Sequence, residues 1–217
     1  MTQAHPAKFS KPIIELLQEE TASVVGLALD PFAGTGRVHE LQRKGLRTVG
    51  IEIEPEWAGI HPQTVVGNAL HLPFPDNTFD AVVTSPCYGN RMADSHNARD
   101  DSKRNTYTHT LGRKLHDDNS GAMQWGDEYR HFHLRAWMEA YRVLKPSRGA
   151  RQRLMIVNIS NHIRAGKEID VVGWHFTALE AVGFKLVRVR TVETQRNREG
   201  ANGDLRCEHE VVGTFTH

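Results

Sequence analysis

The chain has 217 residues, and its 39% hydrophobic and 24% charged content is typical of a soluble globular domain. This length favours a single domain with a full core. Lys and Arg (27) nearly balance Asp and Glu (26), so the basic excess of a dedicated nucleic-acid module is missing. No apolar run approaches the roughly 18 residues of a membrane span, and the first residues lack a secretory signal. Two cysteines, Cys87 and Cys207, make neither a disulfide framework nor a zinc site, so we expect a reducing cytoplasm and no bound metal.

The first half of the chain alternates helical patterns with short apolar runs. Ser10 is expected to cap a helix that has Pro12 in its first turn. A buried strand at residues 24–29 ends at Asp30, and a short helix carrying Val38 and Leu41 follows it. Further strands are expected at residues 48–51, 64–66 and 79–84.

The second half begins with a long polar stretch, residues 89–126, that has no clear period. A structureless stretch of this length in a compact domain is usually functional or mobile, so we predict a mobile target-recognition insert within the single domain of residues 1–217. Regular patterns then return, and they predict helices at residues 129–144 and 171–182 and strands at residues 154–159, 185–194 and 207–215.

Strands that alternate with helices predict an α/β fold, in which a parallel sheet is covered by helices on both faces. Ligands of such sheets bind at the carboxyl ends of the strands. Polar or glycine-rich residues follow each expected strand of the first half: Asp30 with Gly34 and Gly36, Glu52, Asn68, and the Ser85, Pro86, Cys87, Tyr88 tetrad. The sequence therefore predicts a binding site at this edge.

The loop of residues 30–36 indicates a nucleoside cofactor. Glycines let a backbone approach a ligand closely, and Glu52 at the end of the next strand could accept hydrogen bonds from ribose hydroxyls. His39 stands where the dinucleotide fingerprint has its third glycine, which disfavours a pyrophosphate. A nucleoside without phosphates fits better, and S-adenosylmethionine is the cofactor we expect.

With these motifs the chain resembles the S-adenosylmethionine-dependent DNA amino-methyltransferases, which modify cytosine N4 or adenine N6. Four segments carry the resemblance: residues 5–9 (HPAKF), the glycine loop 30–36 (DPFAGTG), Glu52, and residues 84–88 (TSPCY), which look like the family's catalytic tetrad. The resemblance implies a Rossmann-like class I methyltransferase fold, with a mostly parallel seven-stranded sheet and an antiparallel last strand.

The resemblance also implies which residues hold the cofactor. These are Phe9 and Phe32 for its walls, Asp30, Gly34 and Gly36 for the methionine portion, Glu52 for the ribose, and Asn68 and Ala69 for the adenine edge. A core position for Phe9 and a simple turn role for Asn68 stay open as alternatives.

The tetrad residues suit methylation of an exocyclic amine. Such a nitrogen is a poor nucleophile because its lone pair is delocalised into the ring. Ser85 offers a hydroxyl and Pro86 a carbonyl as acceptors, while Tyr88 offers a ring that could stabilise a base flipped out of DNA by about 1–3 kcal/mol. Serine at position 85 favours cytosine N4 over adenine N6.

Cys87 replaces the second proline of the family pattern, so more than one chemistry stays open. A cysteine at a strand end could attack cytosine C6, as in C5 methylation. Against this, residues 157–160 (VNIS) lack the glutamate which that chemistry needs. An RNA base methyltransferase and a catalytically silent protein that binds S-adenosylmethionine also stay open.

Polynucleotide contact would depend on local charge. Six basic residues of the insert and a second group near the C-terminus could neutralise phosphates, although solvent-facing strand charges are an equal alternative. The two groups are Arg91, Arg99, Lys103, Arg104, Arg113 and Lys114, and Lys185, Arg188, Arg190, Arg196 and Arg198. His131 and His133 are expected on a helix surface or in the core, and Trp125 and Trp137 are expected to be core or loop anchors.

Overall fold

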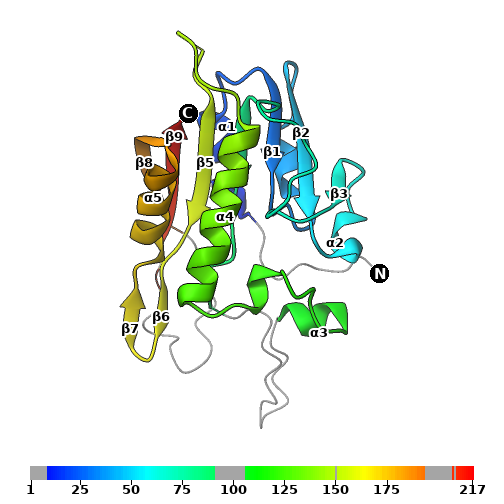
Figure 1. Ribbon diagram of the computed structural model, residues 1–217, viewed down its shortest axis with the longest axis vertical. Coiled ribbons are helices and arrows are strands. Elements are labelled where there is room, and N and C mark those ends of the chain that lie inside the picture. The colour runs from blue at the N-terminus through cyan, green and yellow to red at the C-terminus, as the bar shows by residue number, and fades with distance from the viewer. Residues whose placement is uncertain (1–8, 91–105, 150, 194–206, 208) are drawn as a thin grey trace.

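The computed structural model describes residues 9–90, 106–149, 151–193, 207 and 209–217. Its centre is a seven-stranded sheet in the order β3-β2-β1-β4-β5-β9-β8 (Figure 1). The strands are β1 (Gly26–Asp30), β2 (Leu46–Glu52), β3 (Thr64–Val66), β4 (Ala81–Thr84), β5 (Leu154–Ile159), β8 (Lys185–Glu193) and β9 (His209–Thr216). β1 to β5 are parallel, and β9 runs antiparallel to both β5 and β8.

Helices cover both faces of this sheet. The α-helices are α1 (Lys11–Glu20), α2 (Pro55–Ala58), α3 (Tyr107–Leu111), α4 (Asp127–Val143) and α5 (Val171–Val182), and the 3₁₀ helices are η1 (Arg37–Leu41) and η2 (Ser120–Ala122). α4 and α5 lie on one face and α1 lies on the other (Figure 1). The predicted α/β fold, with its seven-stranded sheet and antiparallel last strand, is confirmed.

Each face of the sheet has its own hydrophobic core because successive strand residues point to opposite sides. Val82 packs with Trp137 and Leu179 on the α4 and α5 side. Its neighbours on β4, Ala81 and Val83, pack on the opposite side against residues of α1 and η1. The strands that carry the predicted site are therefore held from both faces.

The local structure differs from the sequence predictions in several details, although the short helix that carries Val38 and Leu41 is present. Ser10 occupies the N-cap position of α1, but its side chain makes no capping hydrogen bond. The short helix after the glycine loop is a 3₁₀ helix. Residues 106–126 are not structureless, since they contain α3 and η2, whereas residues 91–105 lie outside the described part of the chain. A small antiparallel hairpin of β6 (His162–Arg164) and β7 (Lys167–Ile169), which the sequence patterns did not indicate, follows β5.

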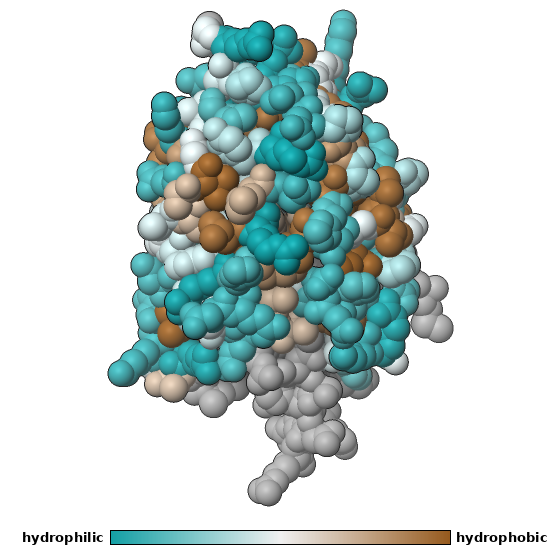
Figure 2. Space-filling view, viewed as in Figure 1, coloured by the Kyte–Doolittle hydropathy of each residue, from teal (hydrophilic) through white to brown (hydrophobic). Residues whose placement is uncertain are grey.

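The surface seen from the α4 side carries its hydrophobic residues in small groups among hydrophilic ones (Figure 2). Within the described residues, no helix has the length and apolarity that crossing a membrane requires.

A buried carboxylate links the amino ends of β1 and β4. The Asp80 side chain accepts a hydrogen bond from the backbone N–H of Leu27 at 3.0 Å and one from Lys145 Nζ at 2.9 Å. Arg153 makes an ion pair with it at 2.5 Å. These contacts fix the two strands against each other at the end opposite the predicted site.

Replacing this carboxylate is expected to destabilise the fold. Asp80→Asn leaves the Lys145 and Arg153 charges without a counter-charge, so the free energy of unfolding in urea should fall by about 3 kcal/mol. The matched control is Asp76→Asn, because Asp76 is exposed and pairs with Arg142 at 2.9 Å. The control should change stability by less than about 0.5 kcal/mol. Equal effects of the two variants would contradict the account of Asp80.

Candidate active site

The carboxyl ends of β1 and β4 are joined by a short hydrogen bond. Thr84, the last residue of β4, donates its hydroxyl to Asp30 Oδ1 at 2.6 Å. The backbone N–H of Phe32 donates to the same oxygen at 3.0 Å. Because Asp30 begins the glycine loop and Thr84 precedes the tetrad, this bond fixes the predicted cofactor loop against the predicted catalytic residues.

Glu52 at the end of β2 holds the same loop from the other side. Its Oε2 accepts the backbone N–H of Gly34 at 2.8 Å, and its Oε1 accepts the N–H of Glu54 at 2.9 Å. Each carboxylate oxygen has a second lone pair, so Glu52 can still accept ribose hydroxyls. The structure thus brings Asp30, Gly34 and Glu52 together as the sequence predicted.

Burial shifts the pKa values of both carboxyl groups upward. Burial raises the pKa of Asp30 to about 7, although the hydrogen bonds from Thr84 and Phe32 oppose the shift. Burial likewise raises the pKa of Glu52 to about 7 against the two backbone N–H groups. Titrating groups with such shifts in one place are typical of functional sites.

Gly36 occupies a position that only glycine fits. Its φ is +82°, and a Cβ there would lie 2.8 Å from His61 Cβ and 2.9 Å from His39 Cδ2. His39 itself is a buried structural residue, with Nδ1 2.7 Å from the Thr48 hydroxyl and Nε2 2.9 Å from the Thr64 hydroxyl. The glycine loop is therefore shaped by packing on its β2 and β3 side.

The tetrad side chains lie at the end of β4. Ser85 Oγ is 3.2 Å from the Tyr88 hydroxyl, and Asn158 Nδ2 at the end of β5 donates to Ser85 Oγ at 3.4 Å. Pro86 is buried, whereas Ser85 and Tyr88 are half-buried. The Tyr88 ring packs partly against the core on the α4 side. The acceptor residues and the ring are thus adjacent, as amine chemistry requires.

Cys87 points away from this acceptor group. Its Sγ is 3.5 Å from the Tyr107 hydroxyl of α3 and packs beside a cluster that includes Trp57. Burial raises the pKa of the Cys87 thiol, with weaker opposing hydrogen bonds from Tyr107 and Ser120. Because the thiolate is the nucleophile in C5 chemistry, this environment disfavours that chemistry.

The remaining predicted cofactor residues make their described contacts with the core and with the insert. Phe9 packs in the core on the α1 side, which is the core position that the sequence left open for it, and Phe32 packs against α4, with its ring centroid 6.1 Å from that of Trp137. The Asn68 side chain closes a turn by accepting a hydrogen bond from the Leu70 N–H, and its amide donates to Asp118 at 2.9 Å. Ala69 is buried. Residues 5–8 lie outside the described part of the chain.

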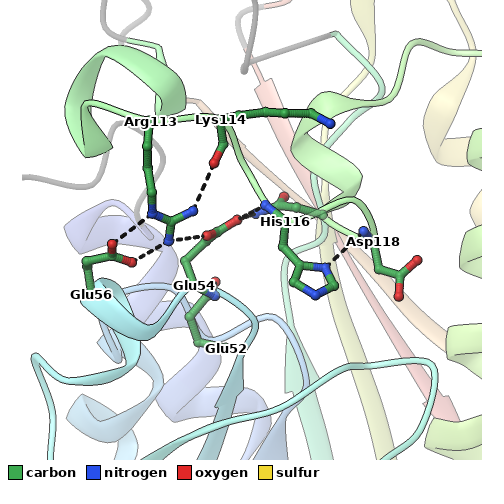
Figure 3. A network of polar contacts seen from close by, with 8 residues as sticks. Glu52, Glu54, Glu56, Arg113, Lys114, His116 and Asp118 are labelled. Atoms are coloured by element: carbon green, nitrogen blue, oxygen red, sulfur yellow. Dashed lines mark hydrogen bonds and ion pairs between the residues drawn. The ribbon is translucent and has the colours of Figure 1, made fainter.

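Glu54 is a fully buried carboxylate that the sequence patterns did not single out. It holds the insert against the cofactor side of the site (Figure 3). Arg113 donates to Glu54 Oε2 at 2.7 Å and also to Glu56. The backbone N–H of His116 and the side chain of Asn119 both donate to Glu54 Oε1 at 2.8 Å. Since Glu54 also donates its N–H to Glu52, residues 113–119 are connected directly to the predicted ribose acceptor.

In this cluster the guanidinium of Arg113, one of the basic residues named as candidate phosphate contacts, is paired with two carboxylates. Lys114 is likewise paired with Asp117 at 2.7 Å. The sequence shows glutamates at positions 52, 54 and 56, and this alternation could have drawn attention to Glu54. Only the fold shows that Glu54 is buried.

Two of the basic residues expected near DNA are also engaged elsewhere. Arg188 on β8 makes an ion pair with Glu20 of α1 at 3.2 Å, and Arg190 makes one with Glu19 at 3.4 Å. Arg196 and Arg198 lie outside the described residues. Among described residues, no group of three potential metal ligands lies close together, and His133 is buried in the core under the tetrad.

Comparison with known families supports the cofactor assignment. Residues 29–96 match the family model of a methyltransferase domain, and this range contains the glycine loop, Glu52 and the tetrad. The match covers less than half of the chain, and it supports S-adenosylmethionine as the cofactor. No curated protein sequence matches the chain.

Solved structures share the fold at low sequence identity. A SAM-dependent methyltransferase from Methanosarcina mazei has a TM-score of 0.57 at 16% identity, over 97% of this chain and 98% of its own. The N-methyltransferase NodS from Bradyrhizobium japonicum WM9 with bound S-adenosylhomocysteine has a TM-score of 0.54 at 12% identity, over 94% and 84%. The [4+2]-cyclase SpnF has a TM-score of 0.58 at 16% identity, over 94% and 79%. A cyclase on this fold illustrates that fold alone does not fix the reaction.

Glu52→Gln is expected to weaken binding of S-adenosylmethionine by about tenfold or more, because hydrogen bonds to a charged acceptor are worth about 1.5–3 kcal/mol. Isothermal titration calorimetry measures the affinity. Glu40→Gln is the matched control, because Glu40 is exposed on η1 and its carboxylate pairs with Arg37. Unchanged affinity in Glu52→Gln would remove Glu52 from the binding site.

Cofactor affinity should also rise with pH. Ribose hydroxyls donate to the carboxylate form of Glu52, whose pKa in the free protein is about 7, so binding below that pH must release a proton. Affinity is therefore expected to be lower at about pH 6 than at about pH 8, and the difference should shrink in Glu52→Gln. A pH-independent affinity in the wild type would contradict the assignment.

Proposed function

We propose that this protein transfers a methyl group from S-adenosylmethionine to an exocyclic amine of a base in DNA, cytosine N4 ahead of adenine N6. The observation that carries the proposal is the Thr84–Asp30 hydrogen bond, which places the tetrad directly beside the glycine loop. The cofactor supplies the electrophilic methyl group. All other steps depend on residues at the carboxyl ends of β1, β2 and β4.

The cofactor side of the site fits a nucleoside. Glu52 keeps free lone pairs beside the glycine loop, and Asp30 lies at the end of the neighbouring strand. Both carboxyl groups are buried, so their interactions with a polar ligand are weakly screened. The loop has no room for a side chain at Gly36, because His39 and His61 pack against it and fix the shape of the loop that would hold the cofactor.

The catalytic side fits an amine. The Ser85 hydroxyl and the Pro86 carbonyl can accept the hydrogens of the amine, which favours a tetrahedral nitrogen with an available lone pair. Asn158 and Tyr88 both contact the Ser85 hydroxyl and restrict its orientation. The Tyr88 ring would stack on the base, which must leave the duplex to reach the site. After transfer the proton is released to water.

Mass spectrometry of nucleosides tests this function. DNA incubated with the protein and S-adenosylmethionine should contain N4-methylcytosine or N6-methyladenine. DNA without any methylated base would contradict the proposal, and a parallel RNA arm would then identify an RNA methyltransferase. A protein that binds the cofactor and methylates neither nucleic acid would be a binding protein.

Variants of the tetrad distinguish amine from C5 chemistry. Ser85→Ala removes one acceptor and should lower kcat by about tenfold to a hundredfold. Ser23→Ala, an exposed serine before β1, is its matched control and should retain full activity. Cys87→Ser should remain active. Formation of 5-methylcytosine together with complete inactivity of folded Cys87→Ser would establish C5 chemistry in its place.

A further inference from the structure

Directly beneath the tetrad, three buried aromatic side chains form a hydrogen-bonded chain that ends on the tetrad backbone. The Tyr129 hydroxyl of α4 donates to the Cys87 carbonyl oxygen at 2.5 Å. The same hydroxyl is 2.8 Å from His175 Nε2 of α5. Trp137 Nε1, two turns further along α4, donates to His175 Nδ1 at 3.1 Å. The chain connects two helices to the peptide between Cys87 and Tyr88.

The hydrogen bonds of these three side chains can run in one direction only, from Trp137 towards the Cys87 carbonyl. The indole N–H of Trp137 is always a donor, so His175 Nδ1 must be an acceptor and carry no proton. The neutral ring then carries its proton on Nε2 and donates it to the Tyr129 oxygen. Tyr129 in turn has its own proton available for the Cys87 carbonyl. Each of the three side chains thus has one defined role.

Burial keeps His175 neutral and Tyr129 protonated, as this direction requires. His175 is fully buried, and burial, with a smaller contribution from His133, lowers its pKa well below the usual value. Burial also raises the pKa of Tyr129 well above its usual value, so the phenol remains protonated. His133 itself donates through Nδ1 to the Tyr129 backbone carbonyl at 2.9 Å and is not part of the chain.

The Cys87 carbonyl is a sensitive point of the tetrad because it lies between the two groups that would contact substrate. Rotating its peptide would move the Pro86 carbonyl on one side and the Tyr88 ring on the other. Gly89, the next residue, has φ of +69°, and its carbonyl accepts the Trp125 N–H at 2.7 Å. The backbone is therefore anchored at Cys87 and again at Gly89, with Tyr88 held between the two anchors.

We propose that Tyr129 and His175 are positioning residues for the methyl transfer: they hold the Cys87 carbonyl and thereby aim the Pro86 carbonyl and the Tyr88 ring at the target amine. This inference rests on the proposed function. Neither residue touches substrate in it. They act only through the backbone of the tetrad. By holding this backbone they keep the acceptor groups aligned with the target amine.

Tyr129→Phe tests the inference because it removes the hydroxyl and little else. The expected result is a kcat about tenfold to a hundredfold lower, since small misplacement of reacting groups has effects of this size. Cofactor affinity should stay within about twofold of wild type, because Glu52 and the glycine loop are untouched. Tyr141→Phe is the matched control: Tyr141 lies on the same helix but packs against Phe184 and His217, away from the tetrad.

His175 offers a rescue experiment. His175→Gln can still accept from Trp137 through its oxygen and donate to Tyr129 through its nitrogen, whereas His175→Leu can do neither. The glutamine variant should keep most of the wild-type kcat and the leucine variant should lose it. In the wild-type protein, nitrogen-15 NMR should show His175 neutral, with its proton on Nε2. Thermal denaturation of every variant identifies those that fail to fold.

The outcomes separate this inference from the function on which it rests. A Tyr129→Phe protein with wild-type kcat overturns the positioning role and leaves the methyltransferase intact. Loss of cofactor affinity in parallel with kcat also overturns it, because that result indicates a general structural role. A wild-type protein that methylates no base overturns the proposed function. The NMR assignment of His175 then decides whether the hydrogen bonds from Trp137 through His175 to Tyr129 form.

Discussion

The 2.6 Å hydrogen bond between Thr84 and Asp30 is the contact on which the site depends. It joins neighbouring parallel strands at their carboxyl ends, where one continues into the glycine loop and the other into the tetrad. It adds to the sheet pairing of β1 and β4 and fixes the two loops that continue from these strands relative to each other. The bond forms because the sheet order puts β1 between β2 and β4, so Glu52, Asp30 and Ser85 come from three consecutive strands.

Buried carboxyl groups are the recurring feature around this contact. Asp30, Glu52 and Glu54 are all nearly inaccessible to solvent, and each accepts several hydrogen bonds. Burial of a charge is unfavourable unless it is paired, and here the partners are mostly backbone N–H groups and the side chains of the insert. Glu54 uses Arg113 and Asn119 to bring residues 113–119 against the cofactor side, so a segment expected to be a loose insert completes the surroundings of the site.

The sequence predicted most of the fold because apolar strands such as residues 154–159 and helices such as α5 have clear patterns and clear ends. The strand ends alone also predicted that the candidate cofactor residues Asp30 and Glu52 lie beside the glycine loop. It could not predict α3 or the β6–β7 hairpin, whose polar residues are ordered by tertiary contacts rather than by a local pattern. The chain of Trp137, His175 and Tyr129 was equally hidden, since it joins residues from two helices.

The most direct test of this account is the position of the bound cofactor's methyl group. S-adenosylmethionine labelled with carbon-13 in its transferable methyl allows nuclear Overhauser effects to be measured in the complex. The account predicts contacts from this methyl group to Pro86 and to the Tyr88 ring, and contacts from the ribose protons to the glycine loop beside Glu52. A methyl group in contact with other residues, or a cofactor bound away from the ends of β1, β2 and β4, would contradict it.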